Sequence, residues 1–215
     1  MRPFKPPRPE PVVIPGPAGP LQALVQEPES SAQYPAAVVC HPHPRFEGTM
    51  HNKVVHTLAR ALNQLGMPAV RFNFRGVGDS AGNFDHGKGE TADALAVLDW
   101  VGQRWPDREQ VLAGFSFGAG VALRAAAAIS PARLITVAPT ICRITLDGFV
   151  QPLFPWLVVI GSQDEFVDCD EVIDWLNTLG PGPELSVIDG AEHFFHGRLI
   201  ELRDIIVDWM KSPAS

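Results

Sequence analysis

The feature that most constrains the fold is the segment from Val111 to Gly120, which reads VLAGFSFGAG. An apolar run of strand length ends in Gly114 and Phe115. Ser116 follows, and after it come small residues suited to a closely packed helix. A turn this sharp needs Gly114 and Gly118, because strand and helix approach each other closely there. The pattern predicts a strand, a strained turn and a helix, with the Ser116 hydroxyl held at the end of a sheet.

The rest of the chain alternates between apolar runs of strand length and amphipathic segments of helical length. This alternation is typical of an α/β fold, in which a mostly parallel sheet is covered by helices on both faces. Strands are predicted at 21–26, 36–41, 69–74, 111–115, 133–138, 156–161 and 185–189, and helices at 51–65, 90–104, 117–129, 169–179 and 196–210.

One domain is predicted at residues 21–215, preceded by a proline-rich arm at 1–20. The arm contains eight prolines, so it is a poor helix and at best supplies an edge strand around Val12–Ile14.

The composition excludes several classes of partner. The chain has 17 basic and 24 acidic residues, a net charge of −7 and no dense basic run, which disfavours nucleic acid and anionic membranes and favours a neutral or small substrate. No apolar run reaches the roughly 18 residues of a bilayer-spanning helix, and the N-terminus has no signal-like stretch. Cys40, Cys142 and Cys169 lack disulfide or zinc spacing, so we expect a cytoplasmic location. The sequence does not indicate the oligomeric state.

A serine hydroxyl is a weak nucleophile unless a base accepts its proton and an acceptor orients that base. His193 follows the last predicted strand, and Asp164 follows the strand before it. Because the carboxyl ends of parallel strands share one edge, we expect Ser116, His193 and Asp164 to meet as nucleophile, base and orienting acid. The alternatives are less well placed: Glu165 and Asp168 as solvated or capping residues, Asp147 as a distant acid, and His196 as a capping or surface histidine.

A tetrahedral intermediate also needs backbone N–H groups directed at its oxyanion. Phe117, directly after Ser116 at a helix N-terminus, supplies one. The second is expected from the loop that follows residues 36–41, where Pro42 and Pro44 have no N–H, so His43 is the first available donor. Arg45 and Phe46 remain alternatives.

Two other patterns have competing interpretations. Gly76-Val77-Gly78-Asp79-Ser80-Ala81 matches a dinucleotide-binding fingerprint, but the glycine-rich residues 82–89 that follow do not open a helix. His41 and His43 have the spacing of a metal-binding pair, yet Arg45 beside them opposes a cation. We therefore expect neither a cofactor nor a metal.

With these motifs in place, residues 20–212 resemble the α/β-hydrolase superfamily. Residues 73–80 (NFRGVGDS) are similar to its D-x-R-G-x-G-x-S loop, with Asn73 in place of the acid. Residues 41–44 (HPHP), followed by 48–50 (GTM) and 52–55 (NKVV), resemble a group of small, lidless bacterial serine hydrolases. The resemblance implies an eight-stranded, mostly parallel sheet, a Ser116-His193-Asp164 triad and ester hydrolysis without a cofactor. Many relatives have His-Gly where this chain has His41-Pro42, which leaves the second oxyanion donor open.

The expected function is that of a serine esterase acting through an acyl-enzyme on small esters with short acyl chains. Only about 17 residues, 139–155, separate two predicted strands, so no cap domain fits and the site is expected to be open. Aromatic residues that could line a shallow slot are Phe46, Phe117, Phe154 and Phe194. Two alternatives stay open: hydrolysis of amides, thioesters or short peptides by the same triad, and a hydrolase-fold binding protein in which the triad is unused.

Overall fold

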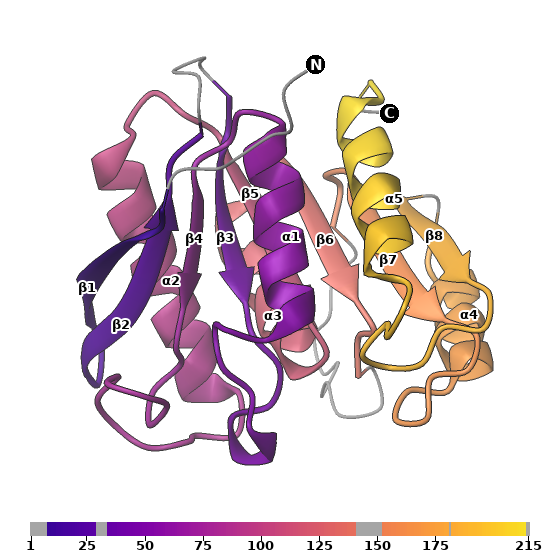
Figure 1. Cartoon of the computed structure of the whole chain (residues 1–215), viewed down its shortest axis with the longest axis horizontal. Helices are drawn as coiled ribbons and strands as arrows, with labels where there is room; N and C mark the ends of the chain where they lie inside the picture. Colours follow the sequence, from indigo (N-terminus) through magenta and orange to yellow (C-terminus); the bar gives the residue numbers. More distant parts are fainter. Residues whose placement is uncertain (1–7, 29–33, 141–151, 181, 214–215) are drawn as a thin grey trace.

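The computed structural model describes residues 8–28, 34–140, 152–180 and 182–213. In these residues the chain forms an eight-stranded sheet flanked by helices (Figure 1). The strands are β1 (Glu10–Gly16), β2 (Gly19–Gln26), β3 (Ala36–Cys40), β4 (Ala69–Phe72), β5 (Gln110–Phe115), β6 (Arg133–Val137), β7 (Trp156–Gly161) and β8 (Pro183–Ile188). The helices are η1 (Pro44–Phe46, a 3-10 turn), α1 (Lys53–Gln64), α2 (Lys88–Arg104), α3 (Phe117–Ile129), α4 (Cys169–Thr178) and α5 (Leu199–Lys211).

The strands follow the order β1-β2-β4-β3-β5-β6-β7-β8. β2 pairs antiparallel with β1 and with β4, whereas all pairings from β4 to β8 are parallel. The predicted α/β fold with a mostly parallel sheet is therefore confirmed. β1 is longer than the edge strand expected at Val12–Ile14, and it tolerates Pro11 and Pro15 because an edge strand has no partner on its outer side.

Helices cover both faces of the sheet: α1 and α5 pack on one face, and α2, α3 and α4 on the other (Figure 1). Side chains alternate between the faces along each strand. In β3, Ala37 and Val39 pack in the layer of α1 and α5, while Val38 and Cys40 pack in the opposite layer. Because both faces are buried, the central strands appear in the sequence as continuous apolar runs.

Most element boundaries differ from the prediction by one to three residues, and two of these differences have a local cause. β4 ends at Phe72. The Asn73 N–H still donates to the Gln22 carbonyl of β2, but the Phe74 N–H leaves the sheet and donates to the His41 ring. The last helix begins at Leu199 rather than His196, because Phe195 and Gly197 have φ angles of 54° and 72°, outside the helical region.

Some sequence-based expectations lie outside the described residues. Residues 141–151 are not described, and they include most of the segment from which the absence of a cap was predicted, together with Cys142 and Asp147. None of the described helices is both long and apolar enough to cross a membrane.

Candidate active site

Ser116 stands between the last residue of β5 and the first residue of α3. Its φ of 56° and ψ of −119° lie in a region that residues with a side chain rarely adopt. A Cβ at Gly114 would collide with the Gly118 carbonyl, and one at Gly118 with the His41 carbonyl. The Ser116 N–H donates to Val137 of β6 at 2.8 Å, which anchors the turn to the sheet. The sharp turn predicted from the two glycines is confirmed, and the packing explains why both are needed.

The three residues expected to act together meet at the carboxyl edge of the sheet. His193, in the loop after β8, places Nε2 3.0 Å from Ser116 Oγ and Nδ1 2.8 Å from Asp164 Oδ2. The histidine and aspartate side chains are 5% and 1% exposed. In this arrangement the His193 Nδ1–H donates to the carboxylate, and Nε2 is left to accept the Ser116 hydroxyl proton.

The Asp164 carboxylate is fixed by its own loop. Its Oδ1 accepts the backbone N–H groups of Phe166 and Val167, both at 2.9 Å, so that Oδ2 points at the histidine. Glu165, expected to be solvated or capping, instead accepts the backbone N–H of His193 at 3.2 Å. Nothing in either segment indicates this contact, because it joins two loops that are distant along the chain.

The remaining alternatives have other roles. Asp168 is the N-cap of α4 and accepts the N–H groups of Asp170 and Glu171. The His196 side chain is 64% exposed and lies 3.5 Å from Glu192, as expected for a surface histidine. Neither residue contacts Ser116 in the structure.

The geometry narrows the choice of a second oxyanion donor. The N–H of Arg45 donates to His43 Nδ1, and the N–H of Phe46 donates to the His43 carbonyl, so both alternatives are committed to bonds within the loop. His43 lines the same cavity as Ser116 and Phe117. Phe117 is the first residue of α3, and its N–H therefore has no acceptor within the helix.

His41 ties two loops together and is not placed to bind a metal. Its buried ring donates from Nδ1 to the Pro42 carbonyl at 2.6 Å and accepts the Phe74 N–H at Nε2 at 3.0 Å. Burial lowers the pKa of His41 to about 4. Both ring nitrogens are thus used by the protein itself, and no cluster of three potential metal ligands occurs in the described part of the chain.

The glycine-rich loop after β4 also bonds to its own chain. Ser80 Oγ donates to the Asn73 carbonyl and accepts the Gln22 N–H, while the Asn73 side chain donates to Gln22 Oε1 at 2.7 Å. Gly76 and Gly78 have positive φ angles that let the loop fold back onto β2. Asn73, where relatives have an acid, is therefore a structural tie between β2 and the loop after β3.

Comparison with known proteins agrees with this geometry. Residues 20–146 match the model of the family described as X-Pro dipeptidyl-peptidase (S15 family). The chain belongs to the S15 family of the α/β-hydrolase superfamily. An α-β serine hydrolase homologue from Coxiella burnetii is 46% identical, with a TM-score of 0.90 over 93% of this chain and 96% of that one.

Two further relatives are similar to this S15-family chain over most of their length. XC6422 from Xanthomonas campestris, described as an α/β serine hydrolase without lid, is 46% identical, with a TM-score of 0.89 over 98% of this chain and 97% of that one. An uncharacterised protein of Rickettsia prowazekii is 35% identical over 91% of this chain and 86% of its own length. The resemblance to small lidless bacterial serine hydrolases is confirmed, and the protein is a hydrolase of the serine type.

The cavity beside Ser116 has a volume of about 370 Å³. Four phenylalanines line it: Phe46, Phe117, Phe166 and Phe194. The expected Phe154 packs against the core instead. Phe166 was not predicted to line the cavity. The turn at Asp164 brings its ring to His193 in an edge-to-face contact, with centroids 5.1 Å apart.

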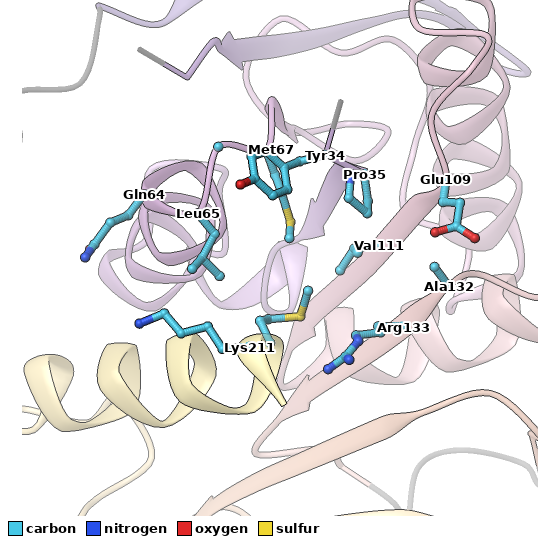
Figure 2. Close-up of a pocket in the computed structure, with 12 residues that line it drawn as sticks. Tyr34, Pro35, Gln64, Leu65, Met67, Glu109, Val111, Ala132, Arg133 and Lys211 are labelled. Carbon is cyan, nitrogen blue, oxygen red and sulfur yellow. The ribbon is translucent and has the colours of Figure 1, made fainter. Parts of the chain in front are cut away.

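A larger cavity, of about 730 Å³, lies at the opposite edge of the sheet, where β3, β5 and β6 begin (Figure 2). Figure 2 shows Leu65 and Met67 on one side of it and Arg133 and Lys211 on the other. The Arg133 guanidinium is committed to the carbonyls of Trp209 and Ser212. Parallel α/β sheets bind ligands at the carboxyl ends of their strands, so the smaller cavity at Ser116 is the candidate site.

Proposed function

We propose that this S15-family hydrolase is a serine carboxylesterase that cleaves small esters with short acyl chains. The observation that carries the proposal is the relay from Ser116 Oγ to His193 Nε2 (3.0 Å) and from His193 Nδ1 to Asp164 (2.8 Å), opening into an apolar cavity. A nucleophile with its base and an orienting acid is the arrangement that acyl transfer requires.

The mechanism follows from these contacts. Ser116 Oγ attacks the ester carbonyl while His193 Nε2 takes the hydroxyl proton, and Asp164 stabilises the resulting imidazolium. The backbone N–H groups of Phe117 and His43 are assigned to the oxyanion. As the tetrahedral intermediate collapses, the alcohol leaves with the proton from His193. Water then gives a proton to His193 and attacks the acyl-enzyme, and release of the acid returns the proton to Ser116. No step needs a metal or a cofactor.

The cavity supports a small substrate. Its volume of about 370 Å³ is near the lower end of the range of roughly 300–1,000 Å³ for small-molecule sites. The four phenylalanine rings offer apolar contact to an acyl chain of a few carbons, and each buried methylene contributes about 0.8 kcal/mol. Two expectations stay predictions. One is that the partner is a small-molecule ester, with no nucleic acid or membrane; the other is the cytoplasmic location expected from the cysteine pattern.

Peptide hydrolysis is the second candidate, because the matching family is described as X-Pro dipeptidyl-peptidase. The Glu47 carboxylate lines the cavity at Ser116 and is of the right charge to bind the ammonium group of a peptide N-terminus. The comparison of kcat/KM for 4-nitrophenyl butyrate and for Ala-Pro 4-nitroanilide separates the two. A preference for the ester supports the esterase, and turnover of the anilide alone establishes the peptidase; the same comparison with thioester and amide analogues tests those alternatives.

The test of the nucleophile is labelling with a fluorophosphonate followed by peptide mapping. We expect one adduct, on Ser116, which Ser116→Ala abolishes. Ser162→Ala is the matched control, because Ser162 also lies at the end of a strand but its hydroxyl donates to Asp189 instead of a histidine. An adduct on Ser162 or Ser80 contradicts the assignment, and a protein that neither reacts nor turns over any ester is a binding protein.

A further inference from the structure

A second cavity lies directly against the catalytic one. It has a volume of about 280 Å³ and is lined by His43, Phe84, His86, Phe117, Gly120, Arg124 and Thr140. Three of these residues, His43, Phe117 and Thr140, also line the cavity at Ser116. The rings of His43 and Phe117 are in contact, with centroids 4.9 Å apart, and form a shared wall between the two spaces. The second cavity is thus a neighbour of the site at Ser116, and a substrate that uses both passes over this pair of rings.

Helix α3 supplies one wall of this second cavity. Phe117, Gly120 and Arg124 are spaced three and four residues apart, so they share one face of the helix. Gly120 has no side chain, which leaves room between the other two. Arg124 lies about 10 Å along the helix axis from Phe117, and side chains on a helix lean toward its N-terminus, which shortens that separation.

Arg124 brings a positive charge into this confined space. Its side chain is half-buried, and burial lowers the pKa of its guanidinium, which nevertheless stays charged. Within the described residues, no side chain or carbonyl forms a hydrogen bond or ion pair with it. Glu90 interacts with it only electrostatically, because that carboxylate accepts the N–H groups of Asp85 and Gly87.

The surroundings of Arg124 preserve space for its guanidinium. Gly87, with a φ of 93°, is the N-cap of α2, and a Cβ there would lie 2.8 Å from the Arg124 Nη1. The five N–H donors of an arginine match the two oxygens of a carboxylate in a planar, bidentate pair. The rings of Phe84 and His86, with centroids 4.9 Å apart, line the same cavity as Arg124.

We propose that the substrates of this enzyme are esters that carry a carboxylate, which Arg124 binds while the ester carbonyl lies at Ser116. This inference rests on the proposed esterase function. The net charge of −7 led to the expectation of a neutral or small substrate. The half-buried arginine changes this expectation, because it places a positive charge beside the site where a small anionic substrate would bind. The separation along α3, shortened because the arginine side chain leans toward the helix N-terminus, suits about three or four carbons between the ester group and the carboxylate.

Two pairs of esters test the proposal, one for each side of the ester bond. The first pair is mono-4-nitrophenyl glutarate and neutral 4-nitrophenyl hexanoate, which differ in the acyl group. The second is 4-acetoxybenzoate and its neutral methyl ester, which differ in the leaving group. For each pair, the ratio of kcat/KM for the anionic ester to that for the neutral ester is measured in wild type, Arg124→Gln and Arg124→Lys. Arg60→Gln, at an exposed position on α1, is the control for removing one positive charge.

We expect Arg124→Gln to lower the ratio about tenfold to a hundredfold in one of the two pairs, the range for losing a hydrogen bond to a charged group. Arg124→Lys restores part of the ratio, and Arg60→Gln leaves it unchanged. A ratio that Arg124→Gln changes by less than about twofold in both pairs overturns the proposal. If wild type and Arg60→Gln hydrolyse none of the four esters, the esterase function itself has failed, which is a distinguishable result.

Discussion

His41 makes the stability of the protein depend on pH in a way that the structure quantifies. The buried ring is neutral in the folded state, and its pKa is lowered from its ordinary 6.5 to about 4. Between these two pH values the unfolded chain binds a proton at His41 that the folded chain does not, so unfolding becomes more favourable as the pH falls. One pKa unit corresponds to 1.36 kcal/mol, so this histidine alone removes about 3 kcal/mol between pH 6.5 and 4. Above pH 6.5 that contribution is present in full.

The variant His41→Gln isolates this effect. Glutamine does not titrate, and its side-chain oxygen is able to accept the Phe74 N–H that His41 accepts in the structure. Near pH 8 the variant should be less stable by about 1 kcal/mol or more, because the hydrogen bond to Pro42 is lost. Urea denaturation from pH 8 to 4 gives the difference in unfolding free energy between the two proteins. Carboxylates common to both cancel in that difference, which should shift by about 3 kcal/mol in favour of the variant by pH 4.

Ser80→Ala is the control for destabilisation without titration. Its buried hydroxyl makes two hydrogen bonds, to Asn73 and Gln22, so the variant loses stability by an amount that stays constant with pH. If the difference in unfolding free energy between wild type and His41→Gln also stayed constant over the whole pH range, the argument would be refuted. His41 would then not be a neutral residue with two hydrogen bonds beneath the active-site loops.

Three further predictions concern activity. With 4-nitrophenyl butyrate, Ser116→Ala and His193→Ala should each lower kcat by on the order of 10⁶. Asp164→Ala should lower it by about 10⁴, because the nucleophile and the base remain in place without their orienting acid. His196→Ala is the control: if it abolishes activity and His193→Ala does not, the base is wrongly assigned. From acetate to butyrate esters, kcat/KM should rise about fourfold per methylene, the equivalent of 0.8 kcal/mol, and then fall once the cavity is full; a preference for chains of about twelve carbons or more, or activation above the critical micelle concentration, contradicts this. A chelator should leave kcat unchanged. If a chelator abolished activity and added zinc restored it, a metal site at His41 and His43 would be indicated.

The sequence predicts those parts of the site that depend on local sterics or on strand direction. A Cβ at Gly114 would collide with Gly118 within the same short motif, so the turn is visible in the sequence. Gly118 is needed because the backbone of Cys40 and His41, at the end of β3, lies against it. The approach of His193 and Asp164 follows from the parallel pairing of β5, β6, β7 and β8, which brings the ends of these strands to one edge. Both inferences need only short segments and the order in which they occur.

The parts that the sequence does not predict depend on packing between distant segments. Glu165 contacts His193 because two loops meet, and nothing in either segment indicates the other. The cavity at Arg124 forms where His43 and Phe84, from two loops distant along the chain, meet the face of α3 that carries Arg124. β1 is longer than expected because edge pairing tolerates prolines that would disrupt an interior strand.

The three side chains of the relay and Arg124 are held by different parts of the fold, whereas His43 and Phe117 line both cavities. Ser116 is anchored by β6, Asp164 by two N–H groups of its own loop and His193 by Glu165, all at the ends of β5, β7 and β8. The second cavity is instead walled by the loops after β3 and β4 and by α3, which supply His43, Phe84 and Arg124. A change at Arg124 therefore leaves the anchors of the relay in place, and substrate choice can vary in this fold without a change in reaction type.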